Sequence, residues 1–112
     1  MSQFDAGKIT LQSGDSIGYS FKFPIASTST ANDGCVPYGR TISTVDVTAY
    51  DEDGDDVTTD LISGTPGLVG DTVSVVLKWP GEVGRYKLTF LLTLDNAWQK
   101  EVDFKNVYAR AL

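Results

Sequence analysis

Apolar and polar residues alternate along most of this 112-residue chain. The clearest run is RYKLTFLLTL, residues 85–94, in which every second residue is a large apolar one. A period of two is that of a β-strand with one buried face, and no stretch shows a convincing 3.6-residue period of an amphipathic helix. The alternation therefore predicts an all-β chain.

Seven such runs can be placed along the chain, at residues 8–13, 16–23, 42–50, 56–62, 72–79, 85–94 and 97–109. Turn residues separate them, and QSGDS between the first two predicts a hairpin. Short antiparallel strands with one wet face each favour an antiparallel β-sandwich of about seven strands. The length fits one domain over residues 1–112, with 1–7 as a flexible N-terminal arm.

The parity of each run selects the residues that should face the core. A register slip of one residue would turn a whole set outward, so the selection is a strict one. The predicted core includes Tyr19, Phe21, Val45, Val47, Val75, Leu77, Trp79, Tyr86, Leu88, Phe90, Leu92 and Phe104. In the last run, Trp98 and Val102 should share the inner face with Phe104.

The stretch WPGEVGRYKLTF, residues 79–90, predicts how the chain reverses direction. Pro80 and Gly81 end one strand, Gly84 lets the chain swing back, and Tyr86 begins the next strand facing inward. This layout resembles the tyrosine corner of immunoglobulin-like domains, in which the tyrosine hydroxyl bonds to the backbone a few residues upstream. We expect that bond within residues 80–84. The alternative is that Tyr86 is a core aromatic only.

The acidic stretch AYDEDGDDVT has two interpretations. Asp51, Asp53 and Asp55 alternate as calcium ligands do, but the glycine stands fourth in the run and Ile62 stands twelfth, so the EF-hand pattern fails. A hairpin in which Asp53-Gly54 makes the tight turn, with solvated acids around it, is favoured. Whether the turn at 51–56 binds anything stays open.

Residues 25–40 form the longest connection, and it is polar and punctuated by glycine and proline. Loops of this length often bind partners or are disordered. Tyr38 and Arg40 are residue types favoured at interfaces. A contact loop and a crossover without a role are equally compatible with the sequence.

The chain contains few of the residue types that carry out catalysis. The chain has no histidine and a single cysteine, Cys35, which excludes a His-based triad, a His metal site and an internal disulfide, and fits a reducing compartment. No pair of carboxylates stands out, and SGTPGLVG lacks the Lys-Ser/Thr of a phosphate loop. We therefore predict no enzyme, no catalytic residues, no cofactor and no metal.

Charge is distributed unevenly along the chain, whose formal net charge is −6. Residues 41–77 contain acids and no Lys or Arg, whereas bases outnumber acids in 78–112. This excludes a basic nucleic-acid footprint, and no apolar run is long enough for a membrane span or a signal peptide. The outward face of 85–94 should combine Arg85 and Lys87 with Leu91, and Val76 should also point outward.

The order of these motifs resembles that of small immunoglobulin-like proteins encoded among the structural genes of tailed phages and prophages. The resemblance covers residues 9–107 and is carried by the GDS turn, YDEDGDDVT, SGTPGLVGDTVSVVLK and GRYKLTFLLTLDNAWQKEVDF. It implies an immunoglobulin-like fold and a non-enzymatic virion component in the capsid decoration, neck or tail. Its partners would be other virion proteins and copies of itself, in the virion and, during assembly, in the host cytoplasm. The alternative is a carbohydrate- or protein-binding module of a bacterial surface protein.

Overall fold

The computed structural model describes residues 8–30 and 34–110 of the chain. Its elements, in chain order, are β1 (Ile9–Gln12), β2 (Ser16–Lys22), β3 (Ile42–Tyr50), α1 (Thr58–Leu61), β4 (Ile62–Val69), β5 (Thr72–Lys78), β6 (Gly84–Leu94) and β7 (Gln99–Arg110). The arm predicted for residues 1–7 lies outside the described residues.

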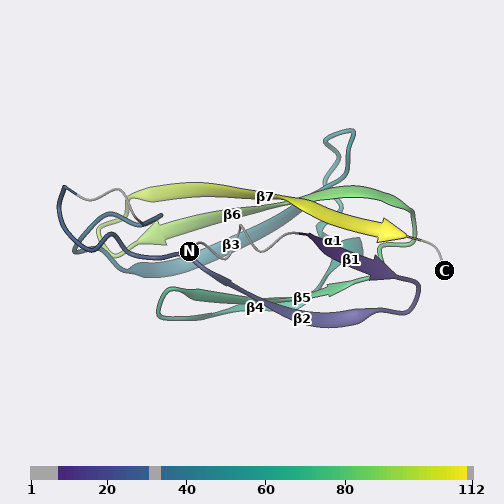
Figure 1. Cartoon of the computed structure of the whole chain (residues 1–112), viewed down its shortest axis with the longest axis horizontal. Helices are drawn as coiled ribbons and strands as arrows, with labels where there is room; N and C mark the ends of the chain where they lie inside the picture. Colours follow the sequence, from purple (N-terminus) through teal and green to yellow (C-terminus); the bar gives the residue numbers. More distant parts are fainter. Residues whose placement is uncertain (1–7, 31–33, 111–112) are drawn as a thin grey trace.

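The strands form two sheets that face each other (Figure 1). One has the order β1-β7-β6-β3 and the other the order β2-β5-β4. The prediction of a mostly β chain with seven strands is confirmed. The prediction that all strands are antiparallel is wrong, because β1 runs parallel to β7 and makes the four-stranded sheet mixed.

The hairpin predicted at QSGDS is also wrong. The turn itself is tight, with the Asp15 N–H donating to the Gln12 carbonyl at 2.9 Å and Gly14 at a φ of 87°. However, β1 and β2 do not pair, because the turn carries the chain from the four-stranded sheet to the three-stranded one. Local turn chemistry was predictable, but the strand that each neighbour pairs with is set by packing.

The fourth strand lies at residues 62–69 and not at 56–62. Residues 58–61 form the single helical turn α1, whose Leu61 is fully buried. β4 contains Gly64, Pro66 and Gly67, which rarely occupy strand interiors. The structure accommodates them by a register shift between Ser63 and Gly67.

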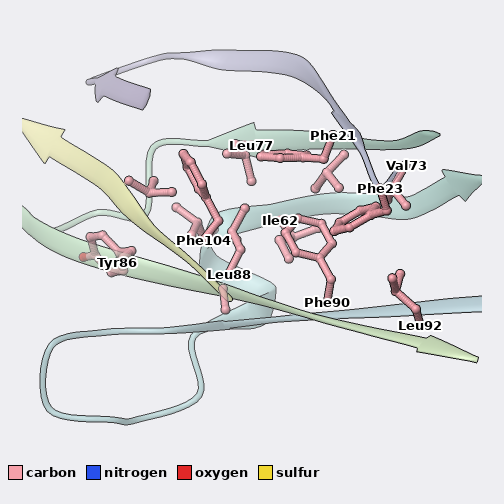
Figure 2. Packing of buried hydrophobic residues seen from close by; sticks show 14 of the residues in the cluster. Phe21, Phe23, Ile62, Val73, Leu77, Tyr86, Leu88, Phe90, Leu92 and Phe104 are labelled. Atoms are coloured by element: carbon pink, nitrogen blue, oxygen red, sulfur yellow. The ribbon is translucent and has the colours of Figure 1, made fainter. Parts of the chain in front are cut away.

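The core lies between the two sheets and confirms the predicted parity (Figure 2). Phe21 packs against Phe90 and Phe104 with ring centroids 4.9 and 5.4 Å away. Most of the predicted core is buried: Phe21, Val75, Leu77, Tyr86, Leu88, Phe90, Leu92 and Phe104. The remaining members are partly buried against it: Tyr19, Val45, Val47 and Trp79.

Two bulges reverse the parity inside single strands. Tyr86 pairs with Val107 and Leu88 pairs with Phe104, so that β7 has one more residue than β6 between these two pairs. As a result, Phe104 and Val107 are both buried although they are three residues apart. A similar shift near the start of β3 buries Ile42. A bulge inserts one extra residue and so moves all later side chains to the opposite face.

Candidate functional site

The long connection between β2 and β3 is anchored where it enters and leaves the sheets. The N–H groups of Cys35 and Val36 donate to the Pro24 carbonyl at 2.7 and 3.1 Å, and the Ala26 N–H donates to the Val36 carbonyl at 2.8 Å. Val36 is 1% exposed and belongs to the core. The described part of this connection is therefore built into the fold.

Gly34 is required where this connection doubles back. A Cβ atom at this position would lie 2.6 Å from both the Pro24 carbonyl oxygen and the Ile25 carbonyl carbon. These are backbone atoms that cannot swing aside, so only glycine permits the approach.

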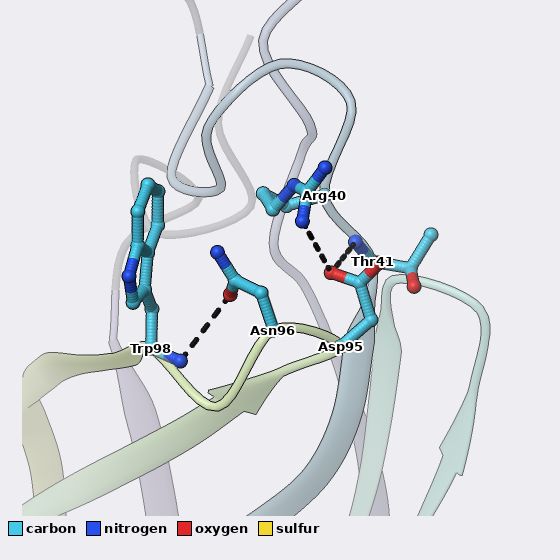
Figure 3. A network of polar contacts seen from close by, with 5 residues as sticks. All are labelled: Arg40, Thr41, Asp95, Asn96 and Trp98. Atoms are coloured by element: carbon cyan, nitrogen blue, oxygen red, sulfur yellow. Dashed lines mark hydrogen bonds and ion pairs between the residues drawn. The ribbon is translucent and has the colours of Figure 1, made fainter.

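A polar network ties the same connection to the β6–β7 turn (Figure 3). The Asp95 N–H donates to the Thr41 carbonyl at 2.9 Å, and the Thr41 N–H reaches Asp95 Oδ1 at 3.4 Å. Arg40 Nη1 lies 3.8 Å from the same carboxylate oxygen. An exposed pair like this adds at most about 1 kcal/mol, so its main effect is on the position of the two loops.

The β6–β7 turn holds Trp98 in an exposed position. The Ala97 φ of 71° is left-handed, and the Ala97 N–H donates to the Leu94 carbonyl at 3.0 Å. The Trp98 N–H donates to Asn96 Oδ1 at 3.2 Å and its carbonyl accepts from the Leu94 N–H at 2.7 Å. The backbone of Trp98 is fixed on both sides while the residue is 60% exposed.

We call this end of the molecule the loop end and define it by Tyr38, Arg40, Asp95 and Trp98. Tyr38 is 56% exposed, and Tyr, Trp and Arg are the residue types that dominate protein interfaces. The sequence singled out Tyr38 and Arg40. It placed Trp98 on the inner face, which is wrong, because the residue lies in the turn before β7 begins at Gln99.

Cys35 belongs to the connection between β2 and β3 and is half-buried. Burial raises the pKa of its thiol above the ordinary value, and the positive charge of Lys100 only partly opposes this. A raised pKa lowers the fraction of thiolate at neutral pH and makes the cysteine a poor nucleophile.

The opposite end of β6 contains the predicted bond of Tyr86. Its hydroxyl donates to the Glu82 carbonyl at 3.0 Å, within the segment 80–84, so this prediction is confirmed. Burial, followed by the negative charge of Glu82 and nearby carboxylates, raises the pKa of the phenol. Next to it, the Arg85 N–H donates to Glu52 Oε1 at 2.9 Å and joins the acidic turn to β6.

The acidic turn is organised around Asp51. Its Oδ1 accepts from the N–H groups of Asp53 and Asp55 at 2.9 Å each, and Gly54 supplies a φ of 87°. A bridge between Tyr50 and Asp56 closes the turn as predicted, but α1 follows instead of a strand. Oxygens of the three alternating aspartates lie within 4.8 Å of one another, so both interpretations of this turn stay open.

Beside the acidic turn lies a shallow hollow of about 380 Å³ with charges of both signs. It is lined by two acids, Asp51 and Glu52, by three bases, Arg85, Lys87 and Lys105, and by Tyr86. Such a hollow suits contact with charged groups on a partner.

The outward apolar residues do not form the mixed basic surface expected from the sequence. Val76 lies in the three-stranded sheet and Leu91 in the four-stranded one, on opposite outer faces of the molecule. The cross-strand neighbours of Leu91 are Asp46 and Glu101, which are acidic. The local environment of Leu91 is therefore negative.

No protein-family model matches the chain, and no curated protein matches its sequence significantly. Across the residues that the structure describes, no helix has the length and hydrophobicity to cross a membrane.

Proposed function

We propose that this chain is a non-enzymatic structural protein of tailed-phage particles. It has an immunoglobulin-like sandwich fold and binds other virion proteins and copies of itself. Its place is in the virion, as capsid decoration or as part of the neck or tail, and in the host cytoplasm during assembly.

The strand order supports the immunoglobulin-like part of the proposal. If the seven strands are lettered A to G, the sheets are A-G-F-C and B-E-D. The immunoglobulin constant arrangement has C, F and G on one sheet and A, B, E and D on the other, so only the first strand differs. The bond from the Tyr86 hydroxyl to Glu82 at the start of β6 is the contact that a tyrosine corner requires.

The exposed loop end carries the proposal that the protein acts by binding other proteins. Trp98 presents a large aromatic side chain on backbone fixed by hydrogen bonds, and Tyr38 lies in a turn that the Arg40 N–H closes by donating to the Pro37 carbonyl at 3.1 Å. Asp95 pairs with Arg40 between the two loops. Tyr and Trp side chains have only two rotatable bonds, so they lose little entropy when they bind. The assignment to a virion comes from the resemblance in motif order.

The exposed indole of Trp98 also favours a second candidate, a carbohydrate- or protein-binding module of a bacterial surface protein. The apolar face of a sugar ring packs well on an exposed aromatic ring. However, neither Trp98 nor Tyr38 lines the hollow beside the acidic turn. That hollow therefore gives no support to a sugar site built around these two aromatic rings.

Mass spectrometry and cryo-electron microscopy of particles from the source phage or induced prophage test the proposal. We expect the chain in complete particles or in an assembly intermediate, and Trp98→Ala to reduce its incorporation at least tenfold, since hot-spot truncations cost about 2 kcal/mol or more. Val83→Ala is the matched control, because Val83 is 62% exposed and lies near the other end of β6. Absence of the chain from particles and all intermediates, with binding to a glycan array, would favour the second candidate.

A further inference from the structure

The free edge of β3 directs backbone groups away from β6, its neighbour in the sheet. β3 is the last strand of the four-stranded sheet, and alternate residues of an antiparallel strand turn their N–H and C=O away from the neighbour. Ala49 does so, because its N–H donates to Thr58 Oγ1 at 3.0 Å and its carbonyl accepts from the Val57 N–H at 2.8 Å. Val47 and Val45 therefore point their backbone groups at the same edge, beyond the end of α1.

A hollow of about 520 Å³ lies beside this edge. Val45 and Val47 from the inner face of β3 line it together with outer-face residues of β3, β6 and β7, among them Asp46, Leu91 and Glu101. The hollow therefore reaches around the edge from one face of the sheet to the other. On the other side it is lined by Thr65 and Pro66, in the irregular part of β4. Because Pro66 has no N–H and its neighbourhood is bulged, β4 does not close the edge.

The outer side of the edge is negatively charged. Asp46 pairs across the sheet with Leu91, and Leu91 pairs with Glu101. Both acids are exposed, and in the described part of the chain no Lys or Arg forms an ion pair with either. A basic side chain placed opposite Asp46 would supply the missing charge.

The same acid argues against a second copy of β3 as the occupant. Symmetric antiparallel pairing centred on Asp46 would bring two like charges directly opposite each other, which is destabilising. Edge strands commonly carry charges that prevent self-association in this way.

We propose that the β3 edge binds an extended segment of a partner protein by strand addition. The segment runs antiparallel to β3, with a Lys or Arg facing Asp46 between two apolar residues that face Val45 and Val47. Backbone bonds to the two valines provide affinity, and the alternating side chains provide selectivity. The inference rests on the proposed assembly function and names the surface and partner chemistry for it.

The first experiment uses the full-length ¹⁵N-labelled protein and a synthetic peptide, acetyl-Thr-Val-Lys-Val-Thr-amide. We expect saturable shift changes and slowed exchange at the amides of Val45 and Val47. A peptide with Glu in place of Lys should bind two- to fivefold more weakly, about the value of one cross-strand charge pair. A peptide N-methylated at both valines has the same side chains but lacks the donors, and should cause no shift.

A second experiment changes the protein. Val47→Pro removes an edge donor but leaves the β3–β6 ladder intact, because that N–H points away from β6. We expect a melting temperature close to that of the wild type and loss of the peptide shifts. Should this variant fail to fold, Asp46→Lys replaces it and should reverse the preference, so that the Glu peptide binds more tightly.

Equal binding of the N-methylated peptide, or shifts along β2 in place of β3, would overturn the inference. So would a complete lack of binding by the unmodified peptide. These results are independent of phage particles, so the inference can fail while the chain is still found in virions. Conversely, absence from particles removes the proposed function without changing the peptide result.

Discussion

Tyr86 stabilises the reversal before β6 through a buried ring and one hydrogen bond. The residue is 6% exposed, and its hydroxyl donates to the Glu82 carbonyl at 3.0 Å. We predict that Tyr86→Phe lowers the free energy of unfolding by about 1 kcal/mol or slightly more, because a part-buried acceptor loses its partner. Urea denaturation measures this, and an unchanged denaturation midpoint would contradict a stabilising bond from the Tyr86 hydroxyl to the Glu82 carbonyl.

The same phenol predicts a dependence of stability on alkaline pH. Burial first, and then nearby carboxylates led by Glu82, raise the pKa of Tyr86 above its ordinary 10.0. The folded state therefore holds this proton more tightly than the unfolded state. Its stabilising contribution is complete below the unfolded pKa and is lost as pH rises through the folded pKa.

We expect the wild-type unfolding free energy to fall above about pH 10 and that of Tyr86→Phe to fall less steeply. Tyr19 contributes in the same direction, because burial and the charge of Asp15 raise its pKa. Tyr86→Phe should therefore remove only part of the slope. Denaturation curves at a series of alkaline pH values check this, and identical slopes for the two proteins would contradict it.

Gly34 and Gly18 form a matched pair that tests how rigidly the connection between β2 and β3 is anchored. A Cβ at Gly34 would meet backbone atoms of Pro24 and Ile25 at 2.6 Å, whereas a Cβ at Gly18 in β2 meets nothing within 4 Å. We predict that Gly34→Ala destabilises the protein by about 1–3 kcal/mol, as overpacking does, while Gly18→Ala is neutral or slightly stabilising. Thermal melts of both variants decide this, and equal effects would count against a rigid anchor.

At the scale of elements, the acidic turn is a hairpin-like loop held by its own side chain. The Asp51 carboxylate already accepts two backbone N–H groups, so the turn has its partner without a cation. We predict that calcium leaves the melting temperature nearly unchanged. Specific binding to the folded state would raise it by mass action. A calcium-dependent rise that a chelator and Asp53→Ala both remove would show a metal site.

Alternation predicted the elements in which it is unbroken. β5 and β6 keep one parity from end to end, and their buried residues follow it. β3 and β7 contain bulges, so that Ile42 and Val107 could not be assigned to the core from parity. β4 was missed because strand propensity is low at Gly64, Pro66 and Gly67, and pairing with β5 overrides it.

The candidate surfaces were less predictable than the strands, for a physical reason. Tyr38 and Arg40 could be selected by residue type, but Arg40 meets Asp95 across a long separation in sequence that only the fold brings together. The edge of β3 is a property of strand order, and strand order is not contained in the period of a single strand. Trp98 continued the alternation by chance and lies in a turn.

At the scale of the whole molecule, the Tyr86 corner and the loop end lie at opposite ends of β6. The molecule is 47 Å long and about half as wide, and β6 runs from the Tyr86 corner to the loop end. Effects of substitutions at distant sites usually add. Variants at the corner should therefore change stability without changing contacts at the loop end.

The first described strand, β1, pairs in parallel with the last strand, β7. Ile9 to Gln12 pair with Val107 to Arg110, and this places Leu11 and Val107 in the core with no exposed surface. In the described part of the chain, β7 is the only strand paired with β1. The stability of β1 therefore depends on residues almost a hundred positions away, and the two strands should open as one unit.

We predict that Val107→Ala lowers the free energy of unfolding by about 2 kcal/mol, from two lost buried methyl groups and the cavity they leave. Val69→Ala is the matched control, since Val69 is 81% exposed and should tolerate the change within about 0.5 kcal/mol. Native-state hydrogen exchange should show the same loss of protection at the β1 amides that are bonded to β7 as in β7 itself. If β7 lost protection while β1 kept it, the prediction that the two strands open as one unit would be wrong.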